Sequence, residues 1–199
     1  MHWYEPEVAS LEKTPVGMTA GAGGVVFYGS SSVRLWGALA EDFPEWAPLN
    51  RGFGGSTLAA CVHFFPRLVL PLRPRLLIVY AGDNDLGDGA APTTVAGDLA
   101  RLVHTAQHAW GRVPLWFLAI KPSPARWALQ PMILECNRLC SAEIERVPGA
   151  RWIDTHTPLL RRDGRPRSEC YEADGLHLSR AGYVVWRDTL RAAAGLAPR

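Results

Sequence analysis

Short, uninterrupted apolar runs recur along the chain, separated by longer stretches whose apolar residues are spaced about one helical turn apart. Strands that are covered on both faces carry such continuous runs, often with β-branched residues. We therefore predict strands at residues 25–28, 75–80 and 113–120, and weaker ones at 47–50 and 150–153.

The stretches between the runs have helical periodicity. They predict helices at residues 33–41, 56–70, 94–110, 131–147 and 179–194. Pro66 is expected to end or kink the second helix, and Ser179 to cap the last one. Alternation of strand and helix predicts an α/β fold whose parallel sheet is covered on both faces. The active site of such a sheet lies beyond the carboxyl ends of its strands.

Composition narrows the class of protein. The 199 residues suit one domain with a substantial core. The net charge of +2 is too small to indicate binding to nucleic acid or to an acidic membrane surface. No segment reaches the roughly 18 apolar residues that a membrane span needs, and residues 1–10 lack the apolar run of a signal peptide. We expect a cytoplasmic protein without membrane insertion; the oligomeric state stays open.

The four cysteines are irregularly spaced and lack a paired C-x-x-C pattern. They are expected to be thiols, with no metal site. They lie at Cys61, Cys136, Cys140 and Cys170.

Two segments rich in serine and glycine follow predicted strands. Residues 29–32 read GSSS and precede a predicted helix. A serine at such a turn can present its hydroxyl above the sheet edge, beside N–H groups that suit an oxyanion; helix capping is the alternative role. Residues 50–57 read NRGFGGST, and Gly55 could direct its N–H at an oxyanion. A tight turn would also explain these glycines.

Two further segments carry an amide and an acid–imidazole pair. Residues 82–85 read GDND, which places the amide of Asn84 after a strand, although such residues also dominate turns. These residues do not fit a calcium-binding loop that begins at Asp83, because Asp88 occupies the position where such a loop requires glycine. Near the last helix, Asp174 precedes His177 by three residues. Its carboxylate can accept the imidazole Nδ1–H and leave Nε2 free to act as a base.

Together these segments supply what acyl transfer requires: a nucleophile, a base, a group that orients the base, and donors for an oxyanion. Each lies at a separate strand end, and in a parallel sheet those ends meet at one edge. No metal or cofactor is needed for this chemistry.

The four segments, in this order, resemble the signature blocks of the SGNH/GDSL hydrolases over about residues 25–183. The resemblance implies one domain over residues 1–199, with 1–23 as an N-terminal extension and 195–199 frayed. It implies a flavodoxin-like three-layer α/β/α sandwich with about five parallel strands. It further implies Ser31 as nucleophile, His177 as base and Asp174 as its partner. The oxyanion hole would be the N–H groups of Ser31 and Gly55 and the amide of Asn84.

The first block departs from the family, which usually has Gly-Asp-Ser where this chain has Gly-Ser-Ser. We assign Ser31 because it stands two residues after Gly29, as the family's serine does. Ser30 and Ser32 remain alternatives. The longer stretches GSSSVRLW and IKPSPARW resemble a GSSS-type branch of the family.

The substrate is expected to be a small-molecule ester. Acetylated sugars, short acyl esters, thioesters and lysophospholipids all fit the motifs. Substrate-binding candidates flank the blocks, at Arg34, Phe53 and Trp127, with Trp36, Arg126 and Tyr171 as further pocket-wall candidates. Two other functions compete: a ligand-binding protein on the same fold without catalysis, and a nucleotide-binding protein. The second rests on GFGGST, which has Thr57 where a dinucleotide fingerprint needs glycine.

Overall fold

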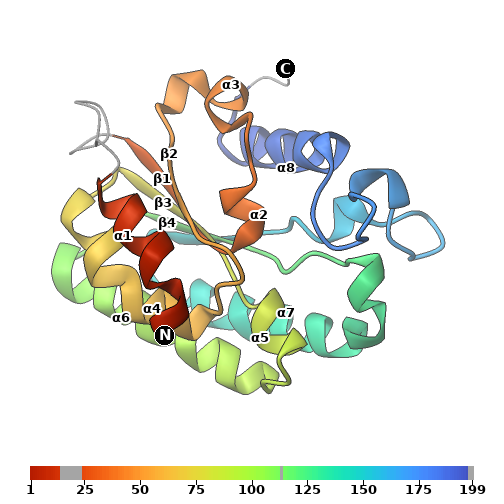
Figure 1. The fold of residues 1–199 in the computed structure, drawn as a ribbon, viewed down its shortest axis with the longest axis horizontal. Helices are drawn as coiled ribbons and strands as arrows, with labels where there is room; N and C mark the ends of the chain where they lie inside the picture. Colours follow the sequence, from red (N-terminus) through yellow and green to blue (C-terminus); the bar gives the residue numbers. More distant parts are fainter. Residues whose placement is uncertain (14–23, 113, 197–199) are drawn as a thin grey trace.

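Five parallel strands form one sheet through the centre of the molecule, with helices on both faces (Figure 1). The computed structural model describes residues 1–13, 24–112 and 114–196. The strand order is β2-β1-β3-β4-β5. The strands are β1 Val25–Gly29, β2 Leu49–Gly52, β3 Leu76–Tyr80, β4 Leu115–Leu118 and β5 Ala150–Ile153. The predicted α/β/α sandwich with five parallel strands is confirmed.

Helices connect the strands and cover the sheet. The α-helices are α1 Glu5–Lys13, α2 Ser31–Arg34, α3 Leu39–Asp42, α4 Leu58–Leu68, α5 Asp83–Gly87, α6 Pro92–Trp110, α7 Gln130–Glu145 and α8 Arg180–Ala193. Short 3₁₀ helices are η1 His2–Tyr4, η2 Pro44–Trp46, η3 Leu70–Leu72, η4 Pro124–Leu129, η5 Thr157–Leu159 and η6 Ser168–Cys170.

The central strands β1, β3 and β4 are buried on both faces, which explains their continuous apolar runs in the sequence. The edge strands β2 and β5 are only partly buried. In β1, Val26 and Tyr28 belong to the core beneath α1, α4, α6 and α7. Val25 and Phe27 belong to the opposite core, which includes residues of α2, α3 and α8. Side chains of a strand point alternately to its two faces, so one apolar strand contributes to two cores.

The register of the sheet brings three of the four blocks to one level. Gly29, the last residue of β1, pairs with Gly52 of β2 on one side and with Tyr80 of β3 on the other. From β1 the chain first adds β2 on one side and then builds β3 to β5 on the other. This change of direction leaves a crevice at the carboxyl ends of β1 and β3, where ligands bind in sheets of this kind.

The helix predicted at 33–41 is instead two short helices, α2 and α3. Between them Trp36 turns into the core, where its ring contacts Phe27 and Trp186. Its indole N–H donates to Asp42 at 2.7 Å, which closes the turn. The apolar spacing was therefore that of a packed turn rather than of one continuous helix.

The other predicted helices lie close to their expected bounds, and α4 ends two residues after Pro66. Ser179 caps α8 by accepting the N–H of Gly182. Two helices were missed. In α1 only Val8 is buried, so its apolar pattern is weak, and α5 consists of residues typical of turns. Three stretches lie outside the described residues: 14–23, which belong to the predicted 1–23 extension, residue 113, and 197–199.

Within the described part of the chain, no helix combines the length and apolar character needed to cross a membrane. All four cysteines are buried free thiols. Cys136 and Cys140, one turn apart on α7, have their sulfur atoms 3.9 Å apart.

Candidate active site

The turn after β1 presents a single serine. Gly29 has a φ of +134°, and a Cβ there would overlap the carbonyl of Tyr80, so only glycine fits this close approach. Ser30 N–H then donates to that carbonyl at 3.0 Å. Ser30 and Ser32 are both 2% exposed, whereas Ser31 is partly exposed at the start of α2. The backbone thus buries the two neighbouring serines and leaves Ser31 accessible.

Ser31, His177 and Asp174 form one chain of hydrogen bonds. Nδ1 of His177 lies 2.6 Å from Oδ2 of Asp174. Nε2 of the same ring lies 3.1 Å from Oγ of Ser31, a residue 146 positions away in the sequence. With Nδ1–H donated to the carboxylate, Nε2 is left to accept the serine hydroxyl. His177 therefore lies within hydrogen-bonding reach of both of the other side chains predicted for catalysis.

The carboxylate of Asp174 is held in its ionised form. Its hydrogen bond with His177, followed by those from the N–H groups of Leu176 and His177, lowers its pKa from 3.8 to about 2. Oδ1 accepts these two N–H groups at 2.8 and 2.9 Å. A charged carboxylate against Nδ1 favours the tautomer and the ring orientation that a general base needs.

The loop that carries His177 is fixed to its surroundings by backbone contacts. Tyr171 and Leu178 form an antiparallel bridge, and Glu172 N–H donates to the carbonyl of His177 at 2.9 Å. Tyr183 of α8 donates its hydroxyl to the carbonyl of Ser32 at 3.0 Å, which joins the histidine side of the site to the serine side. The imidazole is therefore held by several independent contacts.

Two of the predicted oxyanion donors have unused backbone N–H groups. Among the described residues, neither Ser31 nor Gly55 donates its N–H to a protein acceptor. Because α2 has only four residues, its dipole is small. Its contribution to binding an oxyanion is therefore the N–H group of Ser31 itself. The block that contains Gly55 is tied to the first block, since Phe53 N–H donates to the carbonyl of Gly29 at 2.9 Å.

The third predicted donor, the amide of Asn84, has a defined orientation. Arg126 Nη2 donates to its Oδ1 at 3.1 Å, and its Nδ2 donates to the carbonyl of Ser56 at 3.1 Å. A guanidinium has only donors and a carbonyl only accepts. These two partners fix which side of the amide carries the N–H groups.

A buried ionic network supports that arrangement. The buried carboxylate of Asp83 accepts from Arg126 Nη1 at 2.6 Å and from the buried ammonium of Lys121. Burial by itself raises the pKa of Asp83, but the two cations together hold it below its usual range. Asp83 therefore stays charged and holds the arginine that orients Asn84.

With this geometry established, the chain can be compared with known proteins. Residues 18–185 match the GDSL-like lipase/acylhydrolase family. The chain belongs to this family. The resemblance found in the four sequence blocks is thereby confirmed. No curated protein gives a significant sequence match.

Solved structures share the fold of this GDSL-like chain. A Streptococcus pneumonia protein provisionally described as a platelet activating factor has 18% identity and a TM-score of 0.82, over 96% of this chain and 94% of its own. A GDSL-like lipase from Bacteroides thetaiotaomicron has 20% identity and a TM-score of 0.72, over 98% and 96%. A catalytic mutant of an acetylxylan esterase from Geobacillus stearothermophilus has 14% identity and a TM-score of 0.71, over 90% and 98%.

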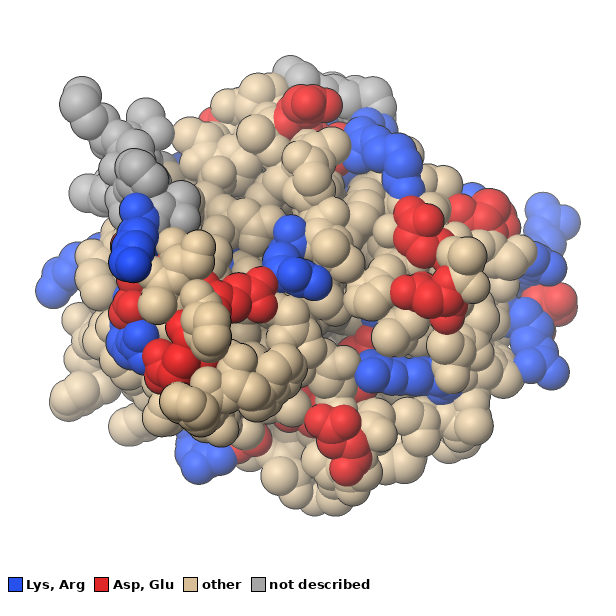
Figure 2. Space-filling view, viewed as in Figure 1, with Lys and Arg blue, Asp and Glu red and all other residues tan. Residues whose placement is uncertain are grey.

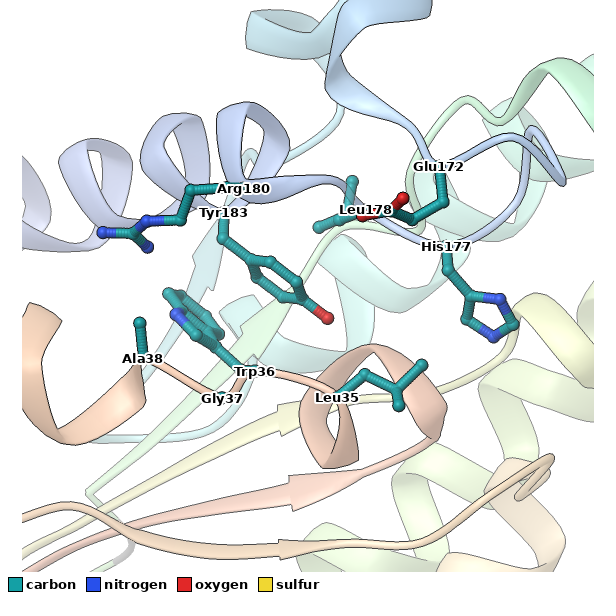
Figure 3. A pocket seen from close by; sticks show the side chains of 9 residues that line it. All are labelled: Leu35, Trp36, Gly37, Ala38, Glu172, His177, Leu178, Arg180 and Tyr183. Atoms are coloured by element: carbon teal, nitrogen blue, oxygen red, sulfur yellow. The ribbon is translucent and has the colours of Figure 1, made fainter.

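A hollow of about 340 Å³ lies beside His177 in this GDSL-like hydrolase. Figure 3 shows it between the turn after α2 and the start of α8, with Leu35 and Tyr183 near the imidazole and Glu172 above it. Its walls are largely apolar, with Trp36 and Leu178 among them. The hollow can therefore take an apolar or amphipathic part of a substrate next to the base.

Of the predicted substrate-binding residues, one is contradicted by the structure and two stay predictions. Phe53 is wrong as a pocket-wall residue, because its side chain is fully buried and packs against Tyr4, Tyr28 and Phe64. Phe53 directly follows the last residue of β2, and its side chain lies in the core although glycines flank it. Arg34 is about half exposed, and it stays a prediction.

Trp127 also stays a prediction. It lies in η4, partly buried, with Arg165 5.2 Å from its ring centre. Of the other candidates, Trp36 lines the hollow and Tyr171 is buried. Arg126 holds Asp83 and Asn84 rather than forming a free pocket wall.

Sequence reasoning missed Lys121 and the role of Asp83. The only signal was the unusual sequence IKPS, a lysine directly after an apolar strand. Its partner lies 38 positions away, and no local pattern indicates that distance.

Proposed function

We propose that the protein is a serine ester hydrolase that acts through Ser31, His177 and Asp174 and a covalent acyl-enzyme. The observation that carries the proposal is the hydrogen-bonded chain from Ser31 Oγ through the imidazole to the carboxylate, with distances of 3.1 and 2.6 Å. Such a chain activates a hydroxyl that is otherwise a weak nucleophile.

In the first step Ser31 Oγ attacks the ester carbonyl and His177 Nε2 takes its proton. The negative charge that develops on the carbonyl oxygen is received by the N–H groups of Ser31 and Gly55 and by the amide of Asn84. His177 then returns the proton to the leaving alcohol. Water, activated by the same imidazole, hydrolyses the acyl-enzyme and restores Ser31.

For the substrate we propose a short-chain acyl ester, with acetylated sugars as the first class to test. The acetylxylan esterase that shares the fold acts on such a class by its description. The hollow beside His177 combines apolar walls with the polar side chains of Glu172 and Arg180. That combination suits an alcohol part with hydroxyl groups as well as an apolar face.

The test compares the purified wild-type protein with Ser31→Ala on p-nitrophenyl acetate, p-nitrophenyl butyrate and acetylated xylooligosaccharides. We expect turnover by the wild type and a fall of about 10⁴-fold or more in kcat for the variant. Equal rates for both proteins would remove Ser31 from the mechanism. Lack of turnover by the wild type on the whole panel would favour a ligand-binding protein on the same fold.

A further inference from the structure

The first residues of the chain pack against the loop that carries Gly55. We call residues 2–13, which form η1 and α1, the N-terminal segment. It precedes the region 18–185 that matches the family. Arg67 of α4 joins it to the body of the protein through ion pairs with Glu5 and Glu12 at 2.9 and 2.8 Å. Figure 2 shows acidic and basic side chains intermixed over this region.

Two side chains of the segment bind the Gly54–Gly55 turn from both sides. Glu7 Oε2 accepts the N–H of Gly54 at 2.9 Å. Tyr4 donates its hydroxyl to the carbonyl of Gly55 at 3.1 Å. The peptide unit between these two glycines, whose N–H is the one predicted to receive the oxyanion, is therefore held at both of its neighbours.

The same turn is also covered by the indole of Trp3. Gly55 has a φ of +63°, and a Cβ there would lie 2.9 Å from Trp3 Cη2, closer than a real contact allows. The ring of Tyr4 is anchored in turn, because it packs edge-on against Phe53 and Phe64. Arg34, 3.5 Å from Glu7, adds a charge that holds the carboxylate in place.

These contacts matter because two consecutive glycines have more backbone freedom than any other pair. Rotation of the Gly54–Gly55 peptide would turn its N–H away from the oxyanion while leaving the rest of the fold intact. We propose that the N-terminal segment contributes to the active site, because its residues Glu7 and Tyr4 position the N–H of Gly55. This proposal rests on the hydrolase function proposed above.

The test measures kcat and KM for p-nitrophenyl acetate, together with Tm, in Glu7→Ala, Glu7→Gln and Tyr4→Phe. We expect kcat to fall between about tenfold and a hundredfold in Glu7→Ala with KM nearly unchanged, because the donor acts on the transition state. Glu7→Gln should recover most of that loss, since its amide oxygen still accepts the N–H of Gly54. Tyr4→Phe keeps the aromatic packing and should lower kcat with little change in Tm.

Glu12→Ala is the matched control, because it removes an ion pair between the same helix and Arg67 without touching the glycines. An equal loss of kcat in Glu12→Ala and Glu7→Ala would overturn the proposal and reduce the segment to a packing element. Wild-type kcat in both Glu7→Ala and Tyr4→Phe would also overturn it. Ser31→Ala, measured beside them, separates the hydrolase function from the positioning role. If Ser31→Ala is inactive while Glu7→Ala and Tyr4→Phe keep wild-type kcat, only the positioning role fails.

Discussion

Two of the proposed oxyanion donors are held by very different parts of the molecule. The amide of Asn84 is oriented by Arg126, which is fixed in turn by the buried pair of Asp83 and Lys121. The N–H of Gly55 is held by Glu7 and Tyr4 from a partly exposed segment that precedes the family match. The support of Asn84 is ionic and buried, whereas the support of Gly55 joins a partly exposed carboxylate, Glu7, to the buried ring of Tyr4.

The difference predicts how each support fails. A charge that loses its partner inside a protein destabilises the whole fold, because it cannot be solvated where it stands. A carboxylate near the surface can be replaced at little cost to folding, since water substitutes for it. Changes around Asn84 should therefore reduce both stability and activity, whereas changes around Gly55 should reduce activity alone.

The largest effect on stability is expected for Asp83→Ala. It leaves Lys121, only 2% exposed, without its carboxylate. We expect the free energy of unfolding to fall by about 3–5 kcal/mol, measured by urea denaturation. Glu135→Ala is the control, because it breaks an exposed ion pair with Arg138 and should change the free energy of unfolding very little. Equal losses in the two variants would mean that burial does not distinguish the network.

Arg126→Lys sharpens the comparison within the buried support. A lysine can still pair with Asp83, but its single nitrogen cannot at the same time replace Nη1 at Asp83 and Nη2 at Asn84. We expect kcat to fall by about tenfold while the free energy of unfolding changes much less than in Asp83→Ala. Arg138→Lys, on the exposed face of α7, should leave kcat unchanged. Full activity of Arg126→Lys would show that Asn84 needs no such orientation.

The smallest effect concerns Asp174 and pH. Its folded-state pKa of about 2 lies below the ordinary 3.8, so the ionised carboxylate stabilises the fold above pH 3.8, and that contribution is lost as the pH falls through about 2. Asp174→Asn lacks it. The difference in Tm between wild type and variant should therefore shrink over that interval, and by little, because the side chain is 48% exposed. A constant difference across the interval would contradict the low pKa.

The sequence allowed much of the fold to be predicted, for a physical reason. The central strands β1, β3 and β4 are buried on both faces and carry continuous apolar runs, which is why their positions could be predicted. The edge strand β5 was also predicted with its observed bounds, 150–153, although it is only partly buried. The first three blocks could be found because they lie at the ends of β1, β2 and β3. The prediction of a strand end is wrong for the fourth block, which lies in the loop between η6 and α8. Helix α5 could not, because Asp83 and Asn84 also favour turns.

The residues that hold Asn84 and Gly55 in place could not be predicted from local sequence patterns. Asp83 lies 38 and 43 positions from Lys121 and Arg126, and Tyr4 lies 51 positions from Gly55. Only tertiary packing brings such residues together. Phe53 shows the opposite error, since its place beside glycines suggested a pocket although its side chain, just after β2, lies in the core.

The central claim is that Ser31, among three consecutive serines, is the nucleophile. Labelling with a fluorophosphonate probe, followed by mapping of the adduct by mass spectrometry, tests it most directly. The account predicts one adduct, on Ser31, that forms much more slowly in His177→Ala and is absent from Ser31→Ala. An adduct on Ser30 or Ser32, or labelling that is unaffected by the loss of the imidazole, would contradict it.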